Sequence, residues 1–327
     1  MGKTTVILNP GAGHQNTGRF IEFLQSRSRR PPPFDLRITR SRSHLEEVAR
    51  SSFREYSNLI LAGGDSTFAI AVNAILRGME AHPETELRAR FHGKRLGILA
   101  RGSANDIARE LGTESLDDLL QAIGEKRTRP MDLGLMSVDG HPLWFLGSAS
   151  IGLGATVNRF IEGFKNRHPR WSRFPLVRHT LMGMVYIGKS FRQGRVPVPV
   201  ILEENDRHLE KNVTLLVFLN GSTYGGGLRF FPGTHLFDGQ LTAVMVDTPT
   251  CARTLGLAFR IMAGGSRSPR GIQRFPGRQF SVTGTVPFTV QYDGEITEPC
   301  RHLQVRLKEA VLPVLVGPGF EFSPPLV

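Results

Sequence analysis

The stretch Asn58-Leu59-Ile60-Leu61-Ala62-Gly63-Gly64-Asp65-Ser66-Thr67 decides how the first part of this chain is interpreted. Four apolar residues lead into two glycines, an acid and two hydroxyl side chains, and apolar residues at helical spacing follow from Phe68. The pattern predicts a strand, a tight turn and a helix. Paired glycines let the backbone approach a bulky group, and the N–H groups at a helix start favour phosphate. An ordinary turn can have the same composition.

The composition indicates a folded protein with an anionic partner. The chain has 327 residues, 40% of them hydrophobic, and a net charge of +12. This length allows two domains. The charge favours a phosphorylated small molecule, an anionic membrane surface or nucleic acid. We expect no nucleic acid, because the basic stretches lack a recognition motif and alternate with bulky apolar residues.

The cellular location is predicted from cysteines and hydropathy. Cys251 and Cys300 give no disulfide framework, which indicates a reducing compartment. The first apolar run, Val6-Ile7-Leu8, is too short for a signal peptide, and no window of the sequence predicts a transmembrane helix. We therefore expect a cytoplasmic protein, soluble or peripherally associated with the inner face of the membrane.

The pattern of strand-like and helical runs changes near residue 133. Strand-like runs alternate with helical patterns over 1–133, which predicts a mostly parallel sheet covered on both faces. Strand-like runs dominate over 134–327, with helical patterns at roughly 155–192 and 249–263. The expected fold class is an α/β nucleotide-binding domain followed by a β-sandwich domain.

Five further motifs accompany the opening stretch, each in the strand–loop context expected for it. They are Asn9-Pro10-Gly11-Ala12-Gly13, Gly102-Ser103-Ala104-Asn105-Asp106, Tyr224-Gly225-Gly226-Gly227, Pro232 with Asp238-Gly239-Gln240-Leu241, and Asp293-Gly294-Glu295. In this order the motifs resemble the diacylglycerol kinase catalytic-domain family, which includes bacterial lipid kinases, sphingosine kinases and ceramide kinases. The resemblance runs from Asn9 to about Leu312.

The resemblance implies a fold and a reaction. The family has an α/β nucleotide domain and a β-sandwich domain, with the active site in the cleft between them. Its members use ATP, with Mg²⁺, to phosphorylate the hydroxyl of a lipid. A diacylglycerol-like lipid is the expected substrate, and a ceramide or sphingoid lipid is the first alternative. A homodimer is compatible with the sequence.

Two other functions remain open. An NAD kinase-like enzyme would share the Gly-Gly-Asp turn. It would also be expected to have a Thr-Gly-Ser-Thr-Ala-Tyr type of segment in the second domain, where this chain has Gly225-Gly226-Gly227 and Asp238-Gly239. A catalytically impaired, basic lipid-binding protein is the non-enzyme alternative. This alternative would apply if Ser66 had disabled catalysis. The presence of Asp65, Asp293 and Glu295 argues against a loss of catalytic function.

The resemblance also implies the site residues. Asp65 and Asp293 are candidates both for the base that accepts the hydroxyl proton and for Mg²⁺ ligation, and Glu295 would orient the base or a metal-bound water. Asp238 matches a second, structural Mg²⁺ position, or it is an ordinary turn residue. The expected ATP-binding residues are Asn9, Pro10, Gly11, Gly13, Gly63, Gly64, Asp65, Ser66, Thr67, Arg101, Gly102, Ser103 and Asn105.

Several residues depart from the family pattern, among them Ser66 and Arg101. Ser66 replaces a glycine, which would cost about 1 kcal/mol if the position needed a positive φ. Arg101 adds a charge that could meet ATP.

A basic segment is expected to contact the membrane. Residues 155–195 carry nine Lys and Arg against one acid, interleaved with large apolar side chains. Such a mixture suits a segment that dips into an anionic leaflet, although a solvated basic face is the alternative. The residues expected at the membrane are Arg167, Arg170, Trp171 and Arg173.

Overall fold

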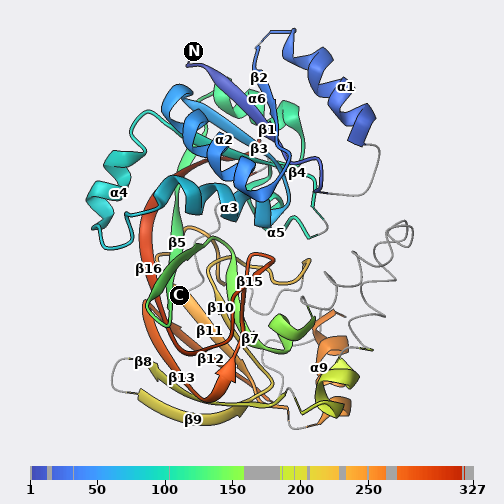
Figure 1. The fold of residues 1–327 in the computed structure, drawn as a ribbon, viewed down its shortest axis with the longest axis vertical. Helices are drawn as coiled ribbons and strands as arrows, with labels where there is room; N and C mark the ends of the chain where they lie inside the picture. The colour runs from blue at the N-terminus through green and yellow to red at the C-terminus, as the bar shows by residue number, and fades with distance from the viewer. Residues whose placement is uncertain are drawn as a thin grey trace. The chain divides into compact units, whose positions relative to one another are not determined.

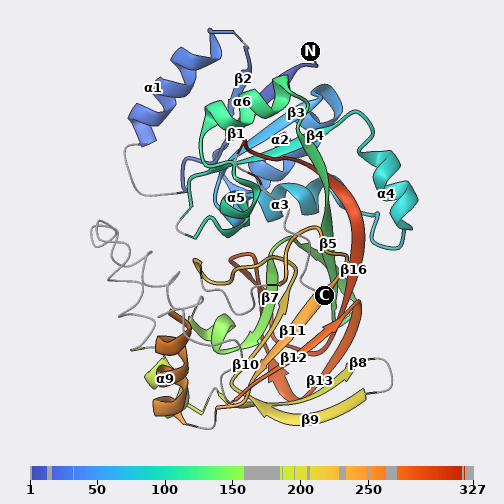
Figure 2. The same ribbon diagram turned by 180° about the vertical axis from the view of Figure 1, so that it is seen from behind.

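The computed structural model divides into two compact units. The first unit comprises Met1–Leu133, His235–Gly239 and Lys308–Val327, and the second comprises Gly134–Thr234 and Gln240–Leu307. Figures 1 and 2 show the chain from opposite sides. The described residues are 2–12, 17–31, 33–102, 104–157, 185, 187–194, 196–204, 207–227, 233–248, 250–262, 271–318 and 320. Gly13, Ser103, Arg167, Arg170, Trp171 and Arg173 lie outside them, as does most of the expected insertion at 155–192.

The first unit is built on a parallel sheet. Its strands are β1 (Thr4–Leu8), β2 (Asp35–Ile38), β3 (Asn58–Gly63) and β4 (Arg95–Ala100), in the order β2-β1-β3-β4. The last part of β16 (Cys300–Leu315) adds to this sheet, parallel to β4 through Val314 and Leu96. Every residue of β3 is buried, which explains its continuous apolar run. The parallel sheet predicted from the sequence is confirmed.

Helices cover both faces of this sheet. Side chains of α1 (Thr17–Ser28) and α6 (Leu116–Gly124) share one core cluster with β1, β3 and β4. In Figures 1 and 2, α2 (Arg42–Glu55) and α3 (Asp65–Leu76) lie on the opposite face. The shorter helices are α4 (Glu84–Arg90) and α5 (Asp106–Leu111).

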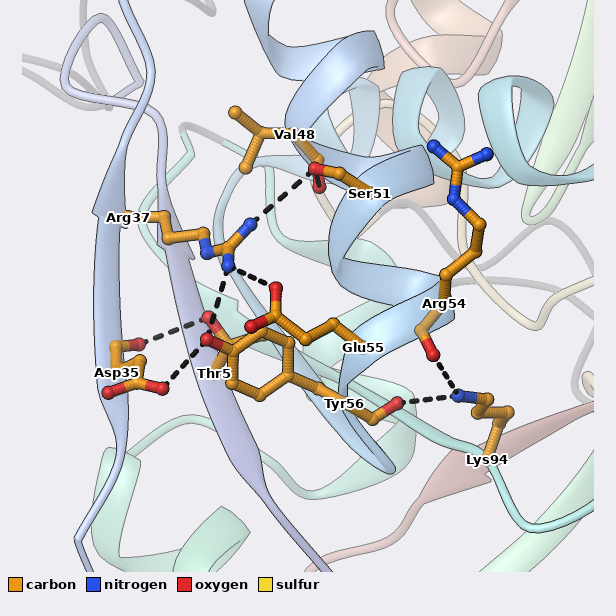
Figure 3. Close-up of polar contacts among 9 residues, drawn as sticks. All are labelled: Thr5, Asp35, Arg37, Val48, Ser51, Arg54, Glu55, Tyr56 and Lys94. Carbon is orange, nitrogen blue, oxygen red and sulfur yellow. Dashed lines mark hydrogen bonds and ion pairs between the residues drawn. The ribbon is translucent and has the colours of Figure 1, made fainter.

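A polar network stabilises the amino-terminal edge of the parallel sheet (Figure 3). Arg37 on β2 contacts Glu55 and Tyr56 at the end of α2, and the Tyr56 hydroxyl donates to Asp35 at 2.7 Å. Lys94, just before β4, donates to the carbonyl of Tyr56 at 2.9 Å. Because these strands are parallel, the network lies at the edge opposite to the Gly-rich loops, and it ties the strand starts to α2.

The second unit consists of two sheets that share a core. One has the order β16-β13-β8-β9, and the other has the order β12-β11-β10-β7-β14-β15. Their inner faces contribute to one buried cluster, in which the rings of Phe218 and Phe280 lie 5.4 Å apart. This arrangement confirms the predicted sandwich. The remaining bounds are β5 (Thr128–Val138), β6 (His141–Phe145), β7 (Ser148–Gly152), β8 (Val198–Glu204), β9 (Arg207–Val213), β10 (Leu215–Leu219), β11 (Leu241–Val246), α9 (Cys251–Met262), β12 (Ile272–Gly277), β13 (Gln279–Phe288), β14 (Val290–Tyr292) and β15 (Glu295–Ile296).

Within the part of the chain that the structure describes, none of the helices has the length and apolar character needed to cross a membrane.

Candidate active site

Three loops meet at the carboxyl-terminal edge of the parallel sheet. They follow β1, β3 and β4, and ligands of parallel α/β sheets bind at this edge. The loop after β1 is joined to the start of α3, because the Asn9 side-chain amide donates to the Thr67 hydroxyl at 3.0 Å. The loop after β4 is joined to β3, because the Arg101 N–H donates to the Gly63 carbonyl at 2.8 Å. The structure therefore brings together residues that the motifs predicted to act together.

Asn9 organises the first loop through both ends of its side chain. Its amide oxygen accepts from the Gly11 N–H at 3.0 Å, and its carbonyl accepts from the Ala12 N–H at 3.1 Å. Pro10 occupies the second position of the resulting turn, where its fixed φ is favourable. The amide nitrogen keeps a second hydrogen beyond the one given to Thr67. The turn thus holds Asn9 in place while leaving it able to donate to a phosphate.

The glycines of the second and third loops are required by close packing. A Cβ on Gly102 would lie 2.6 Å from the Cα of Gly64, and one on Gly64 would lie 3.0 Å from the Cα of Gly102. A Cβ on Gly63 would overlap the side chain of Thr67. The sequence suggested that these glycines make room for phosphates. In the structure, Gly64 and Gly102 also allow the backbones of the second and third loops to pack against each other.

Asn105 closes the third loop. Its backbone is left-handed, with φ 52°, a conformation that asparagine tolerates better than most residues. Its side chain accepts from the Gly102 N–H at 2.7 Å and donates to the Gly102 carbonyl at 3.0 Å. The amide oxygen and the amide nitrogen of Asn105 thus both hold the third loop in its conformation.

Asp65 fastens the second loop to the start of α5. Its two carboxylate oxygens accept from the N–H groups of Asp106 at 3.0 Å and Ile107 at 3.2 Å. Burial, with the nearby charge of Asp106, raises the pKa of Asp65 to about 6, and the two backbone hydrogen bonds offset this only in part. Asp65 was predicted to be a base or a metal ligand. In the structure it also accepts hydrogen bonds from the first N–H groups of α5, and its burial disfavours the ionised form of the carboxylate.

The stability of the chain should depend on pH through Asp65. Its pKa is higher in the folded chain than its ordinary value of 3.8, so its contribution to folding falls as the pH rises through about 6. We expect the unfolding free energy of the wild type, relative to Asp65→Asn, to fall by on the order of 3 kcal/mol between pH 4 and pH 7. Urea denaturation at several pH values measures this difference. A difference independent of pH would contradict the shift.

Ser66 and Arg101, which depart from the family pattern, both fit their surroundings. Ser66 lies in the first turn of α3 and is not among the residues with positive φ, so the cost expected for a left-handed serine does not arise. The Arg101 guanidinium stacks on Phe20 of α1, with 3.9 Å between its central carbon and the ring centroid. Burial lowers the pKa of Arg101. Arg101 therefore also packs the third loop against α1.

Asp238 lies in a turn that belongs to the first unit. Its carboxylate accepts from the His235 N–H at 3.0 Å, and Asp132 accepts from the N–H groups of Gly239 at 2.8 Å and Ala310 at 2.7 Å. Burial raises the pKa of Asp132 to about 6. Among the described residues, no group of three His, Cys, Asp or Glu side chains has a metal-binding arrangement. The geometry of Asp238 is that of a turn residue, and its metal role stays a prediction.

Asp293 lies in the second unit, at the tip of the β14–β15 hairpin. Asp293 and Gly294 have φ values of 43° and 92°, which suits a two-residue hairpin turn. The Asp293 carboxylate is buried and accepts from the N–H groups of Leu146 at 2.6 Å, Gly147 at 2.9 Å and Ser148 at 3.1 Å. Glu295 begins β15 opposite Tyr292 and is half-buried. The carboxylate of the predicted base is therefore held in one orientation, and it also fixes the β6–β7 loop.

Asn220, Ser150 and Gln291 lie near this hairpin or the loop it holds and belong to none of the motifs. Asn220, at the end of β10, donates to the Leu146 carbonyl at 2.5 Å and so holds the same loop from the other side. On the neighbouring strands, the Ser150 hydroxyl donates to Gln291 at 2.8 Å and lies 2.9 Å from the Tyr224 hydroxyl. Burial raises the pKa of Tyr224 to about 12. A polar Gln291 within the apolar run of β14 was the available signal.

Comparison with known proteins agrees with this geometry. Residues 3–136 match the family model described as the diacylglycerol kinase catalytic domain. A "Probable lipid kinase YegS-like" protein of Xanthomonas oryzae is 26% identical, with 83% of this chain and 82% of the relative covered. A diacylglycerol kinase of Mycobacterium tuberculosis is 23% identical, with 81% and 79% covered.

The fold is shared with a solved structure. The crystal structure of a diacylglycerol kinase from Bacillus anthracis is similar, with a TM-score of 0.66, 16% identity and 98% of each chain covered. This similarity extends over both units and confirms the fold class. The family match confirms the resemblance seen in the motifs. Residues 3–136 therefore match a diacylglycerol kinase catalytic domain, and most of the chain is similar to lipid kinases of the diacylglycerol kinase and YegS type.

Proposed function

We propose that this chain transfers the γ-phosphoryl group of ATP to the free hydroxyl of a diacylglycerol-like membrane lipid. The observation that carries the proposal is the junction of three Gly-rich loops at the carboxyl-terminal edge of a sheet that matches the family's catalytic domain. ATP is the phosphate donor that such a kinase family implies. The diacylglycerol-like acceptor is supported by the relative from M. tuberculosis, which is called a diacylglycerol kinase.

The loops of the first unit would hold the phosphates. Asn9 has a donor hydrogen left over, and the Thr67 hydroxyl beside it can donate in turn. The start of α3 adds backbone N–H groups and the positive end of its dipole. The hydrogen bonds among the loops fix these donors before the nucleotide arrives, and this preorganisation is what phosphoryl transfer chiefly requires.

Asp65 fits Mg²⁺ through the chemistry of its surroundings. Burial, with a contribution from the charge of Asp106, raises the pKa of Asp65 to about 6, and a cation beside the carboxylate would favour its ionised form. Mg²⁺ commonly binds one or two carboxylates together with substrate phosphates and water. When bound, it would neutralise charge on the phosphates. We therefore assign Asp65 to hold the cation.

Asp293 is assigned to the acceptor hydroxyl. Three N–H donors fix the orientation of its carboxylate. Phosphoryl transfer passes through a loose transition state, so orienting the hydroxyl matters more than a strongly basic group. Asp293 would align the lipid hydroxyl and accept its proton as the new P–O bond forms and the bond to the departing ADP breaks. We propose Glu295 as a group that supports this step.

The acceptor can be identified directly. The purified chain is incubated with labelled ATP, Mg²⁺ and, separately, diacylglycerol, ceramide, sphingosine and NAD. Transfer of label to diacylglycerol above all others is the expected result. Preferential labelling of ceramide or sphingosine would change the acceptor, and labelling of NAD alone would overturn the assignment. Incorporation into none of them would favour a lipid-binding protein without catalysis.

Ser66→Gly tests whether the serine has impaired the site. Ser66 adopts helical backbone in α3, so the substitution relieves no strain and costs about 0.5 kcal/mol of helix propensity. We expect activity to be retained or raised, because glycine restores the family pattern and leaves more room beside the phosphates. Initial rates at saturating ATP measure this. A large loss of activity would mean that the serine hydroxyl takes part in the reaction.

A further inference from the structure

An exposed aromatic side chain lies on the outer face of α9 in the second unit. Phe259 is 66% exposed, which is the largest value among the large hydrophobic side chains of the described residues. On the inner side of the helix, Thr254 and Leu257 are buried. The residues of the outer face recur at three- and four-residue steps, and they are Ala252, Arg253, Gly256, Phe259 and Arg260. The helix thus presents one large apolar group to solvent between two arginines.

The helical segment 187–192 lies beside α9 and has the same character. The two neighbour each other in both views of the molecule, and a Cβ on Gly188 would lie 3.9 Å from the sulfur of Cys251. Ile187 and Ser190 are buried, whereas Lys189 and Arg192 are exposed. Just before the segment, Val185 is 61% exposed. The two helices therefore form one surface, here called the α9 surface.

The charged residues of the α9 surface are all basic. Residues 185–194 and 250–262 contain four Lys and Arg and no Asp or Glu. Isolated exposed apolar side chains are common, so neither Phe259 nor Val185 alone indicates a site. Their combination with cations and the lack of acids fits a layer that is anionic at its surface and apolar beneath. An anionic lipid bilayer has this profile, and amphipathic helices bind it through an apolar face beside basic residues.

We propose that the α9 surface docks the protein on anionic membranes, with Phe259 inserted below the headgroups and Arg253 and Arg260 on lipid phosphates. The proposal rests on the proposed function for its purpose, because docking would deliver the enzyme to a substrate that stays in the bilayer. The residues named for this surface do not include the expected membrane residues at 167–173.

Vesicle binding tests the surface without any need for catalysis. The full chain is sedimented with phosphatidylcholine vesicles that contain or lack phosphatidylglycerol. We expect Phe259→Ser to lower the partition coefficient about tenfold. Arg253→Gln with Arg260→Gln should lower it about twentyfold, with a smaller effect in high salt, because each cation near an anionic surface contributes about fivefold. Equal binding by wild type and both variants would overturn the proposal.

Matched substitutions elsewhere in the second unit serve as controls. Val286→Ser removes another exposed apolar side chain, which is 47% exposed, and Arg207→Gln removes an exposed cation from β9. Neither should change vesicle binding by more than about twofold. A loss as large as that of Phe259→Ser in either control would show that general charge or hydrophobicity governs binding. Thermal unfolding should be unchanged in every variant, because all the substituted side chains are exposed.

Activity on two forms of substrate separates this proposal from the proposed function. Phe259→Ser should keep wild-type rates on a water-soluble, short-chain diacylglycerol and lose activity on the same lipid class in vesicles. Loss on both substrates would count against a docking role. Absence of activity in the wild type on every lipid would overturn the proposed function while leaving the vesicle-binding result to stand. Equal binding to vesicles with and without phosphatidylglycerol would contradict the role proposed for Arg253 and Arg260.

Discussion

Replacing Asp293 with asparagine should abolish phosphoryl transfer, with kcat lowered by about 10²–10⁴-fold. The substitution keeps the shape of the side chain and removes the charge that would align the acceptor hydroxyl. It also places an amide donor against N–H groups of the 146–148 loop, so we expect a loss of about 1–3 kcal/mol in stability. Initial rates and urea denaturation measure the two effects separately.

Asn220→Ala is the matched control for this experiment. Asn220 holds the same loop through the Leu146 carbonyl, is fully buried and carries no ionisable group. Its removal should cost a similar amount of stability, because a buried carbonyl loses its donor. If Asp293 acts on the hydroxyl, only Asp293→Asn will abolish turnover. If both variants lose activity in proportion to their stability, Asp293 serves the loop alone, and the proton acceptor must be sought elsewhere, with Asp65 first.

Gly102→Ala should raise the KM for ATP by at least about tenfold and lower stability by about 1–3 kcal/mol. The new methyl group would meet the backbone of Gly64 and the side chain of Asn105, and a backbone cannot move aside as a flexible side chain does. The loops after β3 and β4 would separate, and the donors they position would no longer converge on one set of phosphates. Initial rates at varied ATP concentration, together with thermal unfolding, would show both effects.

Gly18→Ala provides the contrasting result. Gly18 lies in α1 of the same unit, and nothing lies within 4 Å of the position its Cβ would take. Alanine favours the helix over glycine by up to about 1 kcal/mol, so this variant should be as stable as the wild type or more so. ATP affinity should not change. Equal behaviour of the two variants would mean that the close packing of Gly64 and Gly102 has no bearing on nucleotide binding.

Local patterns predicted the elements of the site well. The run Leu59 to Ala62, the glycines and the apolar spacing after Phe68 each depend on neighbouring residues only, so strand, turn and helix could be predicted together. The alternation of strands and helices likewise predicted the parallel sheet. Because parallel strands end at one edge, the convergence of the loops after β1, β3 and β4 followed from the same pattern.

The partners of the polar side chains could not be predicted from the same patterns. Nothing near Asp65 in sequence indicates that its carboxylate caps α5, which begins 41 residues later. The N–H groups that surround Asp293 come from residues about 145 positions earlier. Asn220 follows an ordinary apolar strand and offers no motif at all. Motifs identify residues that take part in a site, whereas the choice among ligand, cap and base depends on contacts between distant segments.

The path of β16 sets a condition on how this protein can fold during synthesis. β4 pairs with the end of β16, and Asp132 accepts a hydrogen bond from Ala310, so the sheet of the first unit is completed only by residues beyond Lys308. At about 5–20 residues per second, the ribosome needs roughly 10–40 s to travel from residue 133 to that strand. Over this interval, one side of β4 stays open to pairing with other chains. A nascent chain that stalled before residue 308 would carry the catalytic motifs of the first unit on an incomplete sheet, exposed to aggregation and in need of chaperones.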